Sequence, residues 1–407
     1  MYFNLARLLL FLAPFFAAFG AAAQQFDSTA IGKVKVSGRV VMDGAWFYDT
    51  PANTVMGSGA TFSEMRVRFS TVLSTRTDLR AEFDFAFGEV SFKDIAARYF
   101  VDKNFILSLG NMREPFSPAS MASAAETFFI ATPTAAQAFG CGRNLGLSAR
   151  YYTKHFWVEG GVFGQDIYDQ IKGSKGFAFT NRIIYRPINE DYRVLQLGAG
   201  NSIRRADANG IKTDEGKEVE QRKISFGSRA ETNVNRAKLI SVNNPYANFQ
   251  EKFNVEFLGI YQNMALQAEY INTFVSAKEG YDNQRYYGYY AQAIYQIKGK
   301  GIQYSVYDAW QTKSLEGSIN VGLRYSYTNL NDARGYLVNG IYTNTPDGTT
   351  PNGSFNGGAM QGFTASVSFF PIKSMILTME YNWGKLKNAT LAGSNFQFIQ
   401  AQALFQF

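Results

Sequence analysis

Strict alternation of apolar and charged side chains is the feature that most limits how this chain of 407 residues can fold. It is clearest over residues 77–87, where one parity is apolar and the other charged. The apolar parity holds Thr77, Leu79, Ala81, Phe83, Phe85 and Phe87, and the charged parity holds Asp78, Arg80, Glu82 and Asp84. Because successive side chains of a β-strand point to opposite faces, the segment predicts a strand with one apolar and one charged face.

The same pattern recurs along the whole chain, and no second run of 18 apolar residues follows the N-terminal one. It predicts sixteen strands, at about 31–48, 60–74, 77–87, 90–101, 104–112, 144–153, 155–163, 177–186, 192–203, 251–262, 264–276, 285–297, 318–328, 360–370, 374–384 and 396–407. Most connections alternate between short and long, and the long ones are 113–143, 164–176, 204–250 and 331–359. The segment 298–317 is long where a short turn is expected. Either it is an irregular insertion, or the count is wrong by one hairpin and the chain has eighteen strands.

These features predict an all-β fold, a transmembrane antiparallel β-barrel of about sixteen strands. Charged residues are 18% of the chain, below the roughly 25% of soluble domains, while mean hydropathy is only −0.18. Short turns on one rim and long loops on the other are typical of outer-membrane barrels. A soluble sheet protein could alternate in the same way, with the apolar residues forming its core. The even strand count, the turn asymmetry and the terminal Phe407 favour the membrane barrel.

The N-terminus predicts export. The first 23 residues are typical of a cleaved signal peptide rather than a membrane anchor. They contain the basic Arg7, a short apolar run broken by Pro14, and an Ala-rich cleavage region. The barrel would then occupy residues 24–407 in the outer membrane of a Gram-negative cell. Loss of Arg7 lowers the net charge from +7 to +6. A net positive charge favours binding of anionic solutes or anionic surfaces. Because the chain is expected to be exported, nucleic acid is the least suitable of the anionic partners.

The sequence offers no catalytic constellation. His155 is the single histidine and falls in an expected turn, so neither a histidine metal cluster nor a Ser/His/Asp system is indicated. Cys141 is the single cysteine, which excludes a disulfide framework within the chain. We therefore expect no enzyme activity, no cofactor and no metal site.

The inward face of the predicted barrel carries many cations. Fixed guanidinium groups along one wall attract anions, and charged lumen residues set ion selectivity. Acids share this face, so a mixed-sign wall with mild preference is the alternative. The strand residues expected to line the pore and bind anions are Lys33, Lys35, Arg39, Arg66, Arg68, Arg80, Arg150 and Arg324.

The loop 113–143 is mostly small and apolar, unlike a typical surface loop. Folding back into the barrel would cover it and narrow the pore, whereas packing at a subunit interface is the alternative. The expected constriction residues are Glu114, Pro115, Phe116, Ser117, Phe128 and Phe129.

The ends of this loop resemble a known family. Residues 109–117, LGNMREPFS, and residues 142–146, GRNLG, are similar to the segments that open and close the third external loop of the phosphate-selective porins O and P. The resemblance implies a trimeric sixteen-stranded outer-membrane barrel with that loop folded inward. It also places Arg113 and Arg143 at the roots of the loop, as further pore residues. Residues 114–142 contain no Arg or Lys, which departs from the family's pattern and leaves phosphate specificity open.

The sequence therefore predicts a passive porin for small hydrophilic solutes that favours anions such as phosphate. The expected partners are the lipid bilayer, small anions, two further copies in a homotrimer, and the barrel-assembly machinery through Phe407. A carbohydrate or general diffusion porin is the alternative, with sugar-stacking surfaces from Tyr286, Tyr287, Tyr289, Tyr290, Tyr295, Tyr304 and Tyr307. A barrel enzyme or a structural protein with a plugged lumen is the third interpretation.

Overall fold

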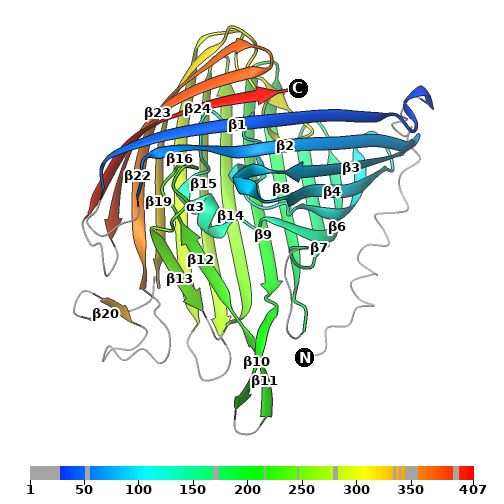
Figure 1. Cartoon of the computed structure of the whole chain (residues 1–407). Coiled ribbons are helices and arrows are strands. Elements are labelled where there is room, and N and C mark those ends of the chain that lie inside the picture. The colour runs from blue at the N-terminus through cyan, green and yellow to red at the C-terminus, as the bar shows by residue number, and fades with distance from the viewer. Residues whose placement is uncertain are drawn as a thin grey trace.

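The computed structural model describes residues 28–50, 56–167, 174–214, 217–244, 247–277, 283–332, 336–338, 341–343, 356–387 and 394–407. The expected signal peptide, 1–23, lies outside them. Sixteen antiparallel strands form one closed barrel (Figure 1). In order around the barrel they are β1 (Val34–Asp49), β2 (Gly59–Ser74), β3 (Thr77–Asp84), β4 (Ser91–Phe100), β5 (Phe105–Arg113), β6 (Arg143–Tyr152), β7 (Phe156–Phe163), β8 (Phe177–Glu190), β9 (Arg193–Arg205), β14 (Ala247–Tyr261), β15 (Met264–Ala277), β16 (Gln284–Lys298), β19 (Ile319–Asn331), β22 (Asn356–Ile372), β23 (Met375–Lys387) and β24 (Asn395–Gln406).

The predicted fold and the count of sixteen strands are confirmed. Each predicted strand overlaps one barrel strand. The irregular segment 298–317 is an insertion and adds no barrel hairpin: it holds only β17 (Tyr304–Ser305) and β18 (Trp310–Gln311), which pair with each other. The alternative of eighteen strands is therefore wrong.

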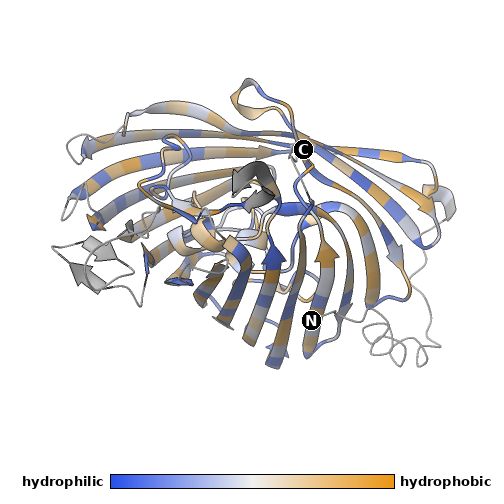
Figure 2. Cartoon of the chain, turned by 90° about the horizontal axis from the view of Figure 1, so that it is seen from below, coloured by the Kyte–Doolittle hydropathy of each residue, from blue (hydrophilic) through white to orange (hydrophobic). Residues whose placement is uncertain are grey.

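Alternation along each strand separates two environments, as the banding in Figure 2 shows. On β8, Phe177 and Phe179 are exposed on the outer face, whereas the alternate residues Ala178 and Thr180 are buried. An outward apolar band with polar side chains inside is the arrangement of a membrane barrel. Apolar side chains can remain on this outer surface because lipid, not water, is their solvent.

The two rims differ. One rim holds the ends of the barrel, at Val34 and Gln406, together with short turns and the insertion 298–317. We call it the short-turn rim. The other, the long-loop rim, carries the long connections, among them the hairpins β10 (Ala208–Asp214)–β11 (Lys217–Arg222) and β12 (Ile224–Ser228)–β13 (Ile240–Asn244). The β10–β11 hairpin projects at the bottom of Figure 1.

The barrel closes where β1 meets β24, with Val40 opposite Phe405. The last residue extends this seam, because Phe407 and Gly38 exchange backbone hydrogen bonds of 2.9 and 3.1 Å. A Cβ at position 38 would lie 2.2 Å from the Phe407 ring and 2.8 Å from the Arg66 carbonyl oxygen. Glycine is therefore what allows the terminal ring to lie over β1.

The lumen is filled on one side only. Inward residues of β8, β14, β15, β16, β19 and β23 are buried in strict alternation. Inward residues of β2 are only partly buried. The loop segments inside the barrel therefore pack against the far wall and leave open space along β1–β6. Among the described residues, the two α-helices, α2 (Pro118–Met121) and α3 (Thr134–Phe139), are short, and no helix is long and apolar enough to cross a membrane.

Candidate functional site: an arginine-lined cavity

The connection between β5 and β6, residues 114–142, contacts the inner wall of the barrel. The Ser117 hydroxyl donates to the Glu269 carboxylate of β15 at 3.0 Å, and the Ile130 amide donates to the Glu380 carboxylate of β23 at 2.8 Å. On the opposite side, the Arg113 guanidinium donates to the Ala122 carbonyl oxygen at 2.8 Å and to that of Met121. We call this segment the inner loop. It spans the lumen between two walls.

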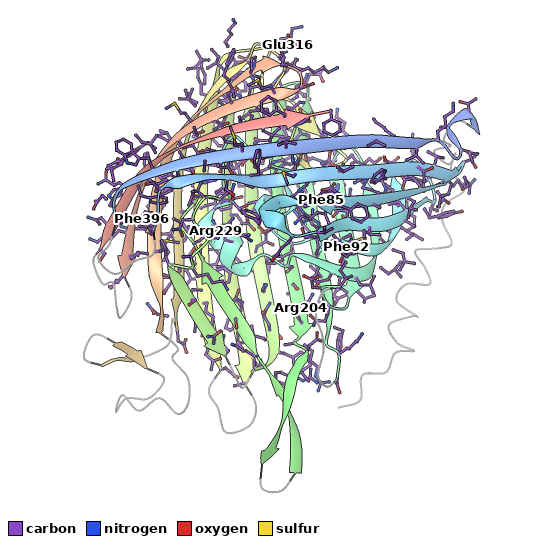
Figure 3. All side chains as sticks on the ribbon, in the orientation of Figure 1. Phe85, Phe92, Arg204, Arg229, Glu316 and Phe396 are labelled. Carbon is purple, nitrogen blue, oxygen red and sulfur yellow. The ribbon has the colours of Figure 1, made fainter. Side chains whose placement is uncertain are left out.

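The root of the inner loop is fixed by a buried carboxylate. Glu114 is 1% exposed and accepts hydrogen bonds from Asn144 and Thr180, both at 2.5 Å, and from Arg204. Arg204, at the end of β9, is labelled in Figure 3. Three strands, β6, β8 and β9, therefore converge on one side chain of the loop, which fixes where the loop leaves the wall.

The aromatic residues of the inner loop pack against protein. Phe116, Phe128 and Phe129 are all buried, and so are Pro115 and Ser117. Phe129 lies under the Arg324 guanidinium, 4.3 Å from its ring centre. These expected constriction residues therefore give the loop its packing, while its small residues face the open space.

A second long-loop segment clamps the inner loop. Glu231, between β12 and β13, accepts hydrogen bonds from the Thr134 amide at 3.2 Å, from Ser326 at 2.6 Å and from Arg324, which also donates to the Ala131 carbonyl oxygen. Glu231 was not among the residues expected from the sequence, because its partners are distant in sequence and it lies in a loop without periodicity.

The open space along β1–β6 holds a cavity of about 360 Å³, here called the arginine cavity. Nine arginines are among its lining residues: Arg39, Arg66, Arg68, Arg80, Arg98, Arg113, Arg143, Arg150 and Arg182. Five acids join them: Glu82, Asp94, Glu126, Glu159 and Asp308. Carboxylates behind this lining also pair with several of these arginines, so the positive character of the cavity comes mainly from the arginines that have no carboxylate partner among the described residues.

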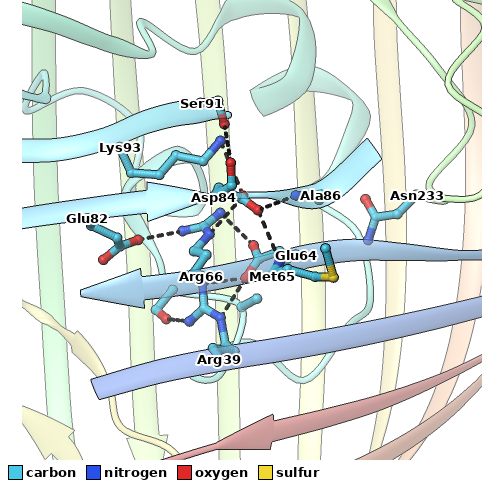
Figure 4. Close-up of polar contacts among 12 residues, drawn as sticks. Arg39, Glu64, Met65, Arg66, Glu82, Asp84, Ala86, Ser91, Lys93 and Asn233 are labelled. Carbon is cyan, nitrogen blue, oxygen red and sulfur yellow. Dashed lines mark hydrogen bonds and ion pairs between the residues drawn. The ribbon is translucent and has the colours of Figure 1, made fainter. Parts of the chain in front are cut away.

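Most of these arginines are held by carboxylates of neighbouring strands. Arg66 is the centre of one network, with Glu64 at 2.7 Å, Glu82 at 3.1 Å and Asp84 at 3.2 Å (Figure 4). Each of these acids has another cation as well: Arg39, Arg68 and Lys93 respectively. Four cations therefore surround three acids, which leaves one net positive charge here.

Two of the arginines lack a carboxylate partner within the described residues. Arg113 donates only to backbone carbonyl groups, and Arg80 makes no hydrogen bond or ion pair with the part of the chain that the structure describes. Their guanidinium groups keep donors available for a solute. A planar guanidinium can bind phosphate or carboxylate through two parallel hydrogen bonds.

A second cavity, of about 430 Å³, lies toward the long-loop rim and shares Arg66, Arg113 and Ala122 with the arginine cavity. Its further cations are Lys93, Arg229 and Arg236. The two cavities meet where Ala122 of the inner loop faces Arg66 of the wall. This junction is the candidate constriction of a path through the barrel.

The expected pore residues fall into two groups. Seven of them line the arginine cavity: Arg39, Arg66, Arg68, Arg80, Arg113, Arg143 and Arg150. Lys33 and Lys35 are instead exposed at the short-turn rim, and Arg324 is 3% exposed under the inner loop, bound to Glu231. Arg98 was not among the expected pore residues, although Asp94, Ala96 and Arg98 share one parity of β4 and one side of the cavity.

The tyrosines considered for sugar stacking do not gather in the lumen. Tyr289 and Tyr295 are exposed on the outer face, while Tyr286 and Tyr290 are fully buried. Of the seven, only Tyr307 is among the residues that line the arginine cavity.

Two loop groups titrate unusually. Burial raises the pKa of the Glu126 carboxyl above its usual range, and the nearby Asp308 charge adds to the rise. Burial likewise raises the pKa of the Cys141 thiol, which makes it a poor nucleophile. No cluster of three or more His, Cys, Asp or Glu suited to a metal ion occurs among the described residues.

Comparison with solved structures shows the same fold at low sequence identity. An anion-selective porin from Comamonas acidovorans has a TM-score of 0.56 and 12% identity, over 92% of this chain and 99% of that chain. The outer membrane channel DcaP of Acinetobacter baumannii has a TM-score of 0.54 and 14% identity, over 95% and 100%. OmpT of Vibrio cholerae, in its trimer form, has a TM-score of 0.55 and 11% identity, over 93% and 100%.

A search of curated proteins found no match. The family description "Phosphate-selective porin O and P", in contrast, matches residues 34–407, nearly the whole chain and all sixteen barrel strands. A porin family and a closed barrel with an apolar outer band imply the outer membrane of a Gram-negative bacterium. The chain belongs to the phosphate-selective porin O and P family and is an outer-membrane porin.

Proposed function

We propose that this porin is a passive channel that favours small anions, and that the arginine cavity is its selectivity site. The observation that carries the proposal is the convergence of nine arginines on one open space. Two of these arginines, Arg80 and Arg113, have no carboxylate partner among the described residues. Anions would gather at the loop-side cations, pass the junction at Arg66 and Arg113, and exchange between guanidinium groups. No energy source is needed, because solutes move down their own gradients.

The inner loop would act as the constriction. It is tied to β15 and β23 on one side and to Arg113 on the other, so its distance from the arginine wall is fixed. The packed side of the lumen then excludes solutes, and permeation follows β1–β6. Guanidinium groups without a carboxylate partner, held beside a low-dielectric surface, attract anions.

Phosphate is the anion class that we propose first. Arg80 and Arg113 offer several N–H donors, and a tetrahedral oxyanion can accept from both if it lies between them. The expected sugar channel has less support, because four of the seven tyrosines named for it lie on the outer surface or in the packed interior, and only Tyr307 lines the arginine cavity.

We further propose that residues 1–23 are a cleaved signal peptide and that three copies associate. We also propose that the assembly machinery recognises the terminal strand through Phe407, which is 71% exposed at the seam.

The test is the zero-current potential of the purified protein in a planar bilayer under a potassium chloride gradient. The proposal is supported if the sign of the zero-current potential shows that chloride is more permeant than potassium, and if added phosphate reduces the chloride current. Conduction without selectivity and without phosphate block supports a general porin. A folded, heat-modifiable barrel that does not conduct contradicts both and favours a plugged barrel.

A further inference from the structure

The insertion 298–317 reaches from the short-turn rim into the lumen and is anchored to the barrel wall. Arg186 donates to the Tyr304 hydroxyl at 2.8 Å and to the Val306 carbonyl oxygen at 3.2 Å. The Trp157 indole donates to the Tyr307 carbonyl oxygen at 2.9 Å, and Trp157 packs with fully buried Ala309. Buried contacts of this kind hold a segment in one position.

The tip of the insertion lies among the cavity arginines. Arg98 donates to the Tyr307 hydroxyl at 2.7 Å, and the Arg150 guanidinium lies 4.9 Å from the centre of the Tyr307 ring. Asp308 follows, and its carboxylate also lines the arginine cavity. The Ser305 hydroxyl donates to one Asp308 oxygen at 2.6 Å, which closes a tight turn and leaves the side chain exposed in the lumen.

The inner loop brings a second carboxylate to the same place. Glu126 lines the cavity with Asp308, and the Gln311 side-chain amide donates to the Glu126 carbonyl oxygen at 3.3 Å. Segments that enter the barrel from opposite rims therefore touch, and each supplies one acid. These acids belong to the inserted segments, whereas most of the cations belong to the wall.

We propose that Asp308 is a selectivity residue at the periplasmic exit of the channel, a fixed negative charge that weakens anion binding beside Arg98 and Arg150 so that bound anions leave. The inference rests on the proposed channel function. Conduction requires binding strong enough to admit an ion and weak enough to release it. Arginines without a carboxylate partner would retain a phosphate-like anion, and the Asp308 carboxylate in the same cavity limits that retention.

The expected effect follows from Coulomb's law. Two unit charges about 7 Å apart in water change a site's occupancy by a factor of about three. Because the charge acts on chloride and potassium with opposite sign, Asp308→Asn should raise the chloride-to-potassium permeability ratio by up to about ninefold, and phosphate should block chloride current at about threefold lower concentration. Glu316→Gln is the matched control, because Glu316 lies in the same insertion, is exposed at the rim (Figure 3) and is not among the cavity-lining residues.

The experiment compares both variants with the wild type in planar bilayers, after each is shown to be heat-modifiable. A shift in Asp308→Asn that is absent in Glu316→Gln supports the inference. Equal permeability ratios and equal phosphate block in both variants would overturn it. The two proposals are tested by different readings. The wild-type ratio tests the proposed function, since a wild type without anion preference contradicts it, whereas the difference between Asp308→Asn and the wild type tests the role of Asp308.

A charge rescue provides the second measurement. Asp308→Cys in a Cys141→Ser background is treated from the periplasmic side with a negatively or a positively charged methanethiosulfonate reagent. The negative adduct should restore the wild-type ratio, and the positive adduct should exceed the Asp308→Asn ratio. Identical ratios after both adducts would show that the charge at position 308 does not act on the permeating ion.

Discussion

Replacing Arg80 with alanine should lower anion selectivity without disturbing the barrel. Arg80 lines the arginine cavity and has no ion pair or hydrogen bond among the described residues, so its removal leaves no buried acid unpaired. A unit charge about 5 Å from the path of an anion contributes about 0.8 kcal/mol in water. At 1.4 kcal/mol per factor of ten, this energy is about a fourfold change for chloride and an opposite one for potassium, so the chloride-to-potassium permeability ratio should fall by up to about 16-fold.

The assay is the zero-current potential of the wild type, Arg80→Ala and Arg80→Lys under one potassium chloride gradient. Arg80→Lys keeps the charge, so it should retain the chloride preference, while its single ammonium group should bind phosphate less well than the planar guanidinium. An unchanged ratio in a heat-modifiable Arg80→Ala barrel would refute the assignment of this wall to the ion path.

Three further predictions concern the packed loop, the titration of the cavity and the seam. Glu231→Ala leaves the Arg324 charge buried without its carboxylate, so thermal unfolding should report a loss of about 3 kcal/mol, with a noisier open-channel current. Because the pKa of Glu126 is raised, its carboxylate should become neutral at a higher pH than an ordinary carboxylate does. Anion selectivity should therefore increase as pH falls through that range. That step should be absent in Glu126→Gln. Gly38→Val places side-chain atoms against Phe407 and the Arg66 carbonyl oxygen, so formation of the heat-modifiable barrel should be slower and the barrel less stable by about 1–3 kcal/mol.

The barrel strands could be predicted from the sequence because their signal is local. Alternation such as that of residues 77–87 follows directly from the two solvents on the two faces of a strand. The same parity identified Arg66, Arg68 and Arg80 as inward residues, and all three line one cavity. Neither step requires knowledge of distant contacts.

The contents of the lumen could not be predicted in the same way. The insertion 298–317 was noticed only as an irregular connection, because its position depends on Arg186 and Trp157, which are more than a hundred residues away. Glu231 and its contact with Arg324 are equally non-local. Arg324 points into the barrel, as its parity predicts, but it is buried under the inner loop and does not line the pore. Parity predicts only that a side chain points inward; whether it then meets water or protein depends on the packed loops.

If the arginine cavity is the selectivity site for small anions, the porin must prefer chloride to potassium and must bind phosphate in the ion path. The most direct test is the zero-current potential of the purified porin under a chloride gradient, measured before and after addition of phosphate. We predict chloride preference, and a chloride current that phosphate reduces at concentrations well below that of chloride. A channel that conducts potassium and chloride equally and ignores phosphate would contradict the claim.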